Sequence, residues 1–145
     1  MKLKEIKNND LVESCLGRWN PNDIAFITQI SFVVKEDMSS STVTMVCLAN
    51  RIDLSYAGWP DRNGAWCKIE LLFTGVYRLT IKDFGPSYSQ ISGFDIINIK
   101  ERNWEGVQYI IEDYENGRIY FECDDIVIIS AEKFDFPFEY PDPTF

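Results

Sequence analysis

Carboxylates are the side chains of this sequence best suited by type to acid–base chemistry or to binding a hard cation. The chain has no histidine, which excludes an imidazole general base and Ser-His-Asp or Cys-His activation of a nucleophile. Asp23 and the adjacent pairs Glu112-Asp113 and Asp124-Asp125 remain as candidates for a hydrolytic pair or a calcium site. Neighbouring side chains on a strand point to opposite faces, so neither pair converges on one ligand. We therefore expect solvated or turn carboxylates, no catalytic residue, and neither a cofactor nor a metal.

Four cysteines are the other potential ligands or nucleophiles: Cys15, Cys47, Cys67 and Cys123. None forms a Cys-x-x-Cys pair, the spacing typical of zinc sites. Each lies in an apolar or amphipathic segment, which favours reduced, buried thiols in a cytoplasmic protein over a disulfide framework.

Charge is distributed unevenly along the 145 residues. The net charge is −9, from 14 basic and 23 acidic residues. Residues 112–145 hold ten of the acidic residues and two of the basic ones, so this last quarter carries −8. Acidity of this kind argues against a nucleic-acid partner. We also expect no membrane association, because no apolar stretch resembles a secretory signal or a membrane-spanning helix.

The hydrophobic pattern predicts one short helix followed by strands. Residues 10–16 are expected to form the helix, since Asp10 and Glu13 have capping-box spacing and Gly17 follows as a C-cap. From residue 26 onward apolar residues alternate with period two, and Gly75 marks a bulge or bend between two strands. The prediction is a single mainly β domain over residues 1–145: an antiparallel meander of about seven or eight strands, forming a sandwich or a partly open barrel, with one short N-terminal helix.

The last hairpin allows a more detailed prediction. Tyr109 and Ile111 share parity with Phe121 and Cys123, so opposed residue numbers must sum to an even value. That excludes a two-residue turn and requires a loop with an odd number of residues, and a three-residue loop at 115–117 with Gly117 left-handed meets this requirement. Tyrosines beside carboxylates on the other face are typical of a protein-recognition surface, although they are also common as cross-strand pairs. The predicted partner-binding residues are Glu112, Tyr114, Tyr120, Glu122, Asp124 and Asp125.

Residues 131–145 combine acidic residues with five aromatic side chains and three prolines. The prolines keep this segment extended. It is expected to be either a C-terminal edge strand with a tail that covers the sheet, or a protruding segment that docks on a partner.

Several short motifs resemble those of immunity protein 50 and related small bacterial immunity proteins of polymorphic toxin systems. The motifs are Leu-Gly-Arg-Trp-Asn-Pro-Asn-Asp-Ile-Ala-Phe at 16–26, Leu-Leu-Phe-Thr-Gly-Val-Tyr-Arg-Leu at 71–79, Gln-Ile-Ser-Gly-Phe at 90–94, and the hairpin at 113–123. The matching structural positions are Trp19, Asp23, Gly75 and Gly93. Where the family commonly has a His-Asp pair, this chain has Asn22-Asp23. We therefore expect Asp23 mainly to accept hydrogen bonds from local backbone N–H groups.

The resemblance implies a cytoplasmic, mainly β protein that binds and neutralises a cognate toxin. The expected mechanism is non-catalytic: an acidic face occludes a basic surface at the toxin's active site. The alternative is a small-ligand-binding β-barrel with an apolar interior, or a structural interaction module. The oligomeric state is left open by the sequence.

Overall fold

A computed structural model describes residues 6–17, 19–36, 40–50, 65–82, 89–90, 94–99, 108–113 and 117–135. Within these ranges the chain forms one helix, one short 3-10 turn and nine strands, of which β5 has only two residues. The elements are α1 (Asn9–Leu16), η2 (Pro21–Asp23), β1 (Ile24–Val34), β2 (Ser41–Asn50), β3 (Trp66–Thr74), β4 (Tyr77–Ile81), β5 (Ser89–Gln90), β6 (Phe94–Asn98), β7 (Tyr109–Asp113), β8 (Ile119–Cys123) and β9 (Asp125–Lys133).

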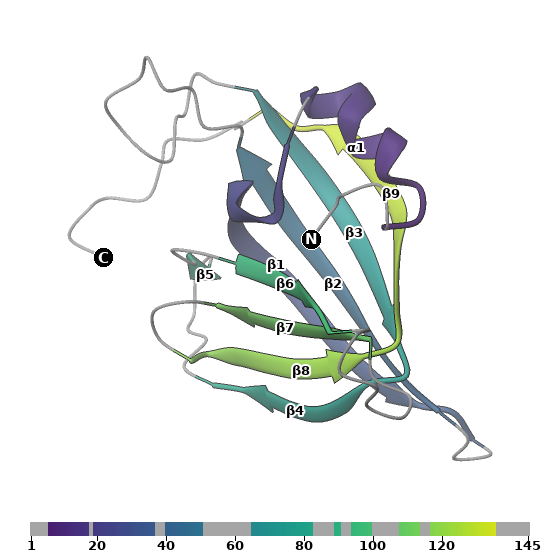
Figure 1. The fold of residues 1–145 in the computed structure, drawn as a ribbon. Helices are drawn as coiled ribbons and strands as arrows, with labels where there is room; N and C mark the ends of the chain where they lie inside the picture. The colour runs from purple at the N-terminus through teal and green to yellow at the C-terminus, as the bar shows by residue number, and fades with distance from the viewer. Residues whose placement is uncertain are drawn as a thin grey trace.

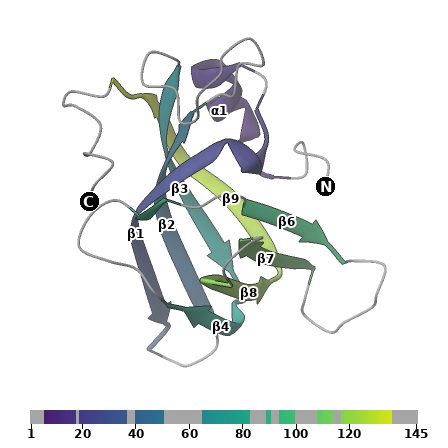
Figure 2. The ribbon, with the colours of Figure 1, turned by 90° about the vertical axis from the view of Figure 1, so that its left-hand side faces the viewer.

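The strands form two antiparallel sheets. The large sheet has the order β5-β1-β2-β3-β9, and the small sheet has the order β4-β8-β7-β6. The small sheet covers one part of the large sheet's inner face, and α1 covers another part beside β3 and β9 (Figures 1 and 2). The prediction of a mainly β, antiparallel fold with one short helix is confirmed. The described strands lie in two separate sheets and do not close into a barrel.

Alternation of apolar residues builds the core between the sheets. Val43, Phe73 and Ile126 form one cross-strand row of the large sheet, and all three are buried. The ring of Phe73 meets that of Phe121 from the small sheet edge to face, with centroids 4.9 Å apart. Trp66 is also buried, and its ring stacks on that of Phe26 with centroids 6.0 Å apart.

The register of the last hairpin follows the parity argument. Tyr109 pairs with Cys123 and Ile111 pairs with Phe121, and all four side chains are buried. Gly117 has a φ of +58°, as the predicted left-handed loop position requires. Residues 114–116 lie outside the described residues.

The helix forms where it was predicted, but its N-terminus is different. Helix α1 begins at Asn9, and Asn8 before it makes no side-chain capping hydrogen bond. The expected Asp10–Glu13 capping box is wrong, because Glu13 instead accepts a hydrogen bond from Asn9 Nδ2. Asn9 in turn accepts one from the indole N–H of the buried Trp19. Gly17 is the C-cap as predicted, and its N–H donates to Glu13 O.

Two neighbouring strands change sheets at one corner. Strand β3 continues through Gly75 into β4, and β8 continues through Asp124 into β9. The two passing segments are hydrogen-bonded, since Asp124 N donates to Thr74 O at 2.9 Å and Thr74 Oγ1 donates to Asp124 Oδ1 at 3.0 Å. Gly75 has a φ of +63°, and a Cβ there would lie 2.6 Å from Asp124 Cγ. The backbone conformation therefore favours glycine, and any larger residue would have to displace the Asp124 carboxylate.

We expect Gly75→Ala to destabilise the protein more than Gly117→Ala. Both glycines are left-handed, which costs an alanine about 1–2 kcal/mol, but nothing lies within 4 Å of a Cβ at Gly117. At Gly75 the displaced Asp124 carboxylate also loses its bond to Thr74, worth about another 1 kcal/mol. Urea denaturation of both variants measures the difference.

The control is the same pair of glycine substitutions in an Asp124→Ala background, where the obstructing carboxylate is gone. There the costs at Gly75 and Gly117 should become equal. A Gly75→Ala cost that stays unchanged by Asp124→Ala would contradict the proposed contact.

Candidate protein-binding face

The outer face of the small sheet gathers three of the polar side chains that could meet a partner. Strand parity turns Ile96, Ile111 and Phe121 into the core. Asp95, Glu112 and Tyr120 therefore project from the opposite face of β6, β7 and β8. They lie in one row across the sheet, because Asp95 pairs with Glu112 and Glu112 pairs with Tyr120. We call Asp95, Glu112, Tyr120 and the neighbouring Glu122 the acidic face.

Asp95 and Glu112 are two like charges placed directly opposite one another. Neither carboxylate joins an ion pair in the described part of the chain, where the two ion pairs are Lys7–Asp125 and Arg78–Glu122. Directly opposed like charges on neighbouring strands are destabilising, by roughly 0.2–1 kcal/mol. The free protein therefore carries an unfavourable interaction that a cation at this position would relieve.

Glu122 lies on the predicted face but is not exposed. Its residue surface is 2% accessible, because Arg78 and Tyr120 cover it. Arg78 NH1 donates to Oε1 and the Tyr120 hydroxyl donates to Oε2 at 2.8 Å. Both carboxylate oxygens of Glu122 thus bind groups of the protein itself, and their direct role is to hold Tyr120 and Arg78 in place.

Arg78 reaches Glu122 from an irregular position in edge strand β4. Its φ is +54°, unusual for a side chain with a Cβ. The residue lies between Tyr77, which pairs with Glu122, and Thr80, where the β4–β8 register is shifted. The arginine side chain is 71% exposed while the glutamate side chain is 3% exposed. The bulge therefore places a solvated cation over a buried anion.

Tyr120 is held as a neutral, oriented aromatic ring. Partial burial, the hydrogen bond to Glu122 and the negative charges of Glu122 and Glu112 raise its pKa to about 12. The ring also packs against a small apolar cluster on this face, formed by Ile99 and Ile110.

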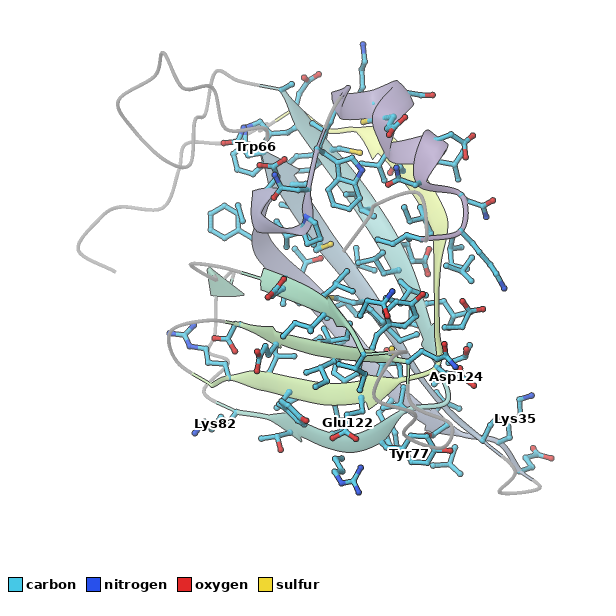
Figure 3. The ribbon with its side chains drawn as sticks, viewed as in Figure 1. Lys35, Trp66, Tyr77, Lys82, Glu122 and Asp124 are labelled. Carbon is cyan, nitrogen blue, oxygen red and sulfur yellow. The ribbon has the colours of Figure 1, made fainter. Side chains whose placement is uncertain are left out.

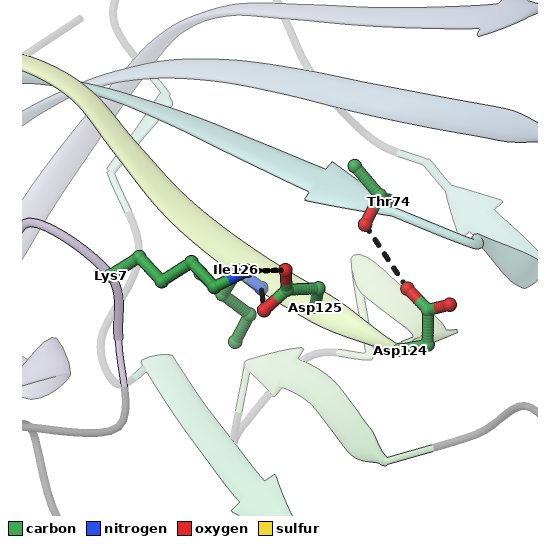
Figure 4. A network of polar contacts seen from close by, with 5 residues as sticks. All are labelled: Lys7, Thr74, Asp124, Asp125 and Ile126. Carbon is green, nitrogen blue, oxygen red and sulfur yellow. Dashed lines mark hydrogen bonds and ion pairs between the residues drawn. The ribbon is translucent and has the colours of Figure 1, made fainter.

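Asp124 and Asp125 lie at the sheet-changing corner and point to different sides (Figure 4). Asp125 forms an ion pair with Lys7 at 2.6 Å and accepts a hydrogen bond from Ile126 N at 3.0 Å. The hydrogen bond to Asp125 is the main cause that raises the pKa of Lys7. Asp124 instead binds Thr74 and is exposed. Of the two carboxylates, only that of Asp124 is exposed and forms no ion pair with a cation of the described residues.

The family-motif residues have structural surroundings. Trp19 and Asp23 are buried, and Gly75 forms the corner. Asp23 Oδ2 accepts a hydrogen bond from Asn20 N at 3.0 Å, as expected for a residue that binds the local backbone. Gly93 and the predicted face residue Tyr114 lie outside the described residues.

The remaining candidates for chemistry are separated from one another. Asp113 accepts a hydrogen bond from Ile119 N at 2.9 Å, whereas Asp23 and Asp125 bind other backbone N–H groups. The three aspartates thus bind different parts of the backbone. The four cysteines are free thiols, and burial raises the pKa of Cys47 to about 12. The described ranges contain no group of three acidic or cysteine side chains placed to hold a metal ion.

An open pocket beside the corner was not predicted from the sequence. It has a volume of about 500 Å³ and lies between the end of the β1–β2 hairpin and the β3–β4 bend. Phe32, Val34 and Tyr77 line it together with Asp124. The sequence signal was present, since residues 28–34 form an uncharged β run, but alternation alone does not show where the small sheet stops covering it.

No family model, curated protein or solved structure matches this chain. Among the described residues, no helix is long and apolar enough to span a membrane.

We expect Tyr120→Phe to lower the stability near neutral pH by about 0.5–1.5 kcal/mol, because the bond to Glu122 is lost. This difference from the native protein should shrink as the pH rises from about 10 to about 12. The Tyr120 pKa is about 12 in the folded protein against a reference value of 10.0. A raised pKa stabilises the fold while the hydroxyl is protonated, and that contribution is lost as the pH passes through the folded value.

Urea midpoints measured between pH 8 and pH 12 provide the comparison. Tyr77→Phe is the control, since it removes one tyrosine hydroxyl from an exposed side chain of the same sheet. A Tyr120→Phe deficit that stays constant across this pH range would contradict the proposed link to Glu122.

Proposed function

We propose that this chain is a non-catalytic immunity protein that binds and neutralises a cognate bacterial toxin in the cytoplasm. In this proposal the acidic face lies over a basic surface at the toxin's active site and occludes it. The observation that carries the proposal is the opposed pair Asp95 and Glu112 beside the oriented ring of Tyr120. The choice of a toxin as the partner rests on the sequence motifs that resemble immunity protein 50.

The electrostatics of the pair favour a cationic partner over any self-contained role. Arg78, which is near this face, is already bound to Glu122. An arginine or lysine of the toxin placed between Asp95 and Glu112 converts a repulsion into two attractions. Complementary charge of this kind also accelerates association, because it acts before contact is made.

Tyr120 supports the proposal through preorganisation. Its hydroxyl is bound by Glu122 and its ring rests on Ile110, so few rotamers remain to be lost on binding. Rigid aromatic side chains next to charged groups frequently dominate the energetics of protein interfaces. Glu122 and Arg78 thus act as positioning residues for the face and need not touch the toxin.

The small-ligand carrier receives less support from the geometry. That alternative expected a barrel with an apolar interior, whereas the described strands form two sheets with Phe73 and Phe121 packed between them. The open pocket lies at the corner rather than inside the core. The remaining alternative is an interaction module that binds a basic protein other than a toxin. The next experiment distinguishes this alternative from the immunity function.

We expect the double variant Asp95→Asn, Glu112→Gln to be more stable than the native protein and to bind the toxin less well. Removing the opposed charges should raise the free energy of unfolding by about 0.2–1 kcal/mol. Losing two attractions to a basic surface should weaken binding about tenfold or more. The candidate partners are the products of the genes next to this protein's own gene. Binding is measured by calorimetry, and protection is measured by survival of toxin-expressing cells.

Glu132→Gln is the matched control, because it neutralises one exposed carboxylate on β9 of the large sheet. It should leave both toxin affinity and cell survival unchanged. If the native protein binds the adjacent gene product but the double variant binds it equally well, the acidic face is not the interface. Absence of any binding or protection by the native protein contradicts the immunity function itself.

A further inference from the structure

The pocket at the corner combines apolar walls with a single carboxylate. Its apolar walls come from β1 and from the β3–β4 bend, where Phe32, Val34 and Tyr77 are each about half exposed, at 49%, 47% and 48%. These are among the most exposed large hydrophobic side chains in the described part of the protein. Clustered apolar exposure around a concavity is characteristic of a binding surface.

Asp124 supplies the negative charge of the pocket. Its Oδ1 accepts a hydrogen bond from Thr74, and within the described residues no hydrogen bond or ion pair involves Oδ2. The carboxylate lies in the space that a side chain at Gly75 would occupy. The cation that lines the pocket is Lys35, which forms no ion pair with Asp124. In Figure 3 the Lys35 side chain points away from Tyr77 at the far end of the hairpin.

The pocket and the acidic face are linked through edge strand β4. Tyr77 lines the pocket and is also the register partner of Glu122, whose carboxylate holds Tyr120. One partner that binds the acidic face near Tyr120 can therefore also reach the pocket. Such a partner needs positive charge opposite Asp95 and Glu112 at one end and opposite Asp124 at the other.

We propose that this pocket receives one arginine side chain of the protein partner. The aliphatic stem of the arginine lies against Phe32 and Val34, and the guanidinium binds Asp124 and stacks on the ring of Tyr77. Arginine fits better than lysine, because its planar group can bind a carboxylate and an aromatic ring together while its stem covers apolar surface. This inference rests on the proposed toxin-binding function, but it can be tested without the toxin.

The experiment is an NMR titration of the ¹⁵N-labelled full chain with two acetylated, amidated tripeptides, Leu-Arg-Leu and Leu-citrulline-Leu. Citrulline has the size and shape of arginine without its charge. We expect the arginine peptide to bind at least about fivefold more tightly, as a charge-assisted pair predicts. The largest shift changes should occur at the amides of Val34, Val76 and Tyr77.

Asp124→Asn separates the pocket from general attraction to an acidic protein. Asparagine keeps the acceptor for Thr74 but removes the charge, so the ratio of the two peptide affinities should fall to about one. Asp135→Asn neutralises an exposed aspartate outside the pocket lining and should leave the ratio unchanged. Phe32→Ser should weaken both peptides equally, since it removes a wall that both stems use.

Equal binding of the two peptides by the native protein, or an unchanged ratio in Asp124→Asn, would overturn the pocket assignment. So would shift changes confined to other surfaces. Because the peptides replace the toxin, this outcome is independent of the immunity proposal. If the protein protects cells but does not prefer the arginine peptide, only the pocket assignment is wrong. If it prefers the arginine peptide but does not protect cells, only the immunity function is wrong.

Discussion

The corner at Gly75 and Asp124 is the constraint on which the rest of the structure depends. Strands β3 and β9 are neighbours in the large sheet, and their continuations β4 and β8 are neighbours in the small sheet. Both chains must therefore cross between the sheets at one place, where Gly75 has a left-handed φ and leaves space for the Asp124 carboxylate. The crossing brings the apolar faces of the two sheets together. It also fixes the positions of Tyr77, Arg78 and Glu122, which lie within three residues of the corner.

The acidic residues fall into two groups, those that bind other parts of the protein and those that do not. Glu122 is buried and holds Arg78 and Tyr120, and Asp125 ties the N-terminal segment to β9 through Lys7. Asp95 and Glu112 form no ion pair with any residue that the structure describes, and their opposition costs stability. The net charge of −9 therefore overstates the charge available to a partner. In our proposal, the charge that attracts the partner is that of Asp95 and Glu112, which lie in one row across the small sheet.

Sequence patterns predicted the features that depend on neighbouring residues or on a regular repeat of apolar residues. Period-two alternation predicted a mainly β chain after the helix, parity gave the register of the last hairpin, and the bend at Gly75 was expected. Prediction failed where a distant residue decides the outcome. Glu122 has the parity of an exposed residue but is covered by Arg78, 44 positions earlier in the chain. The capping box at Asp10 was wrong because Asn9 has a partner in Trp19, beyond the end of the helix.

The acidic face shows the same limit most clearly. Glu112 and Tyr120 were predicted from the hairpin, whose register is set by a short loop. Asp95 was missed, because its position opposite Glu112 depends on the pairing of β6 with β7. The pocket was missed for a related reason, since β1 is uncharged along its whole length but is buried only in its first part.

Carboxylate footprinting tests the central claim most directly. The protein is labelled with a carbodiimide and glycine ethyl ester, alone and in complex with the toxin partner that the proposed function predicts, and modification is measured by mass spectrometry. We expect labelling of Asp95 and Glu112 to fall in the complex, while labelling of Glu132 and Asp135 stays constant. Unchanged labelling of Asp95 and Glu112 in a saturated complex would show that the toxin binds elsewhere and would contradict the assignment of the acidic face.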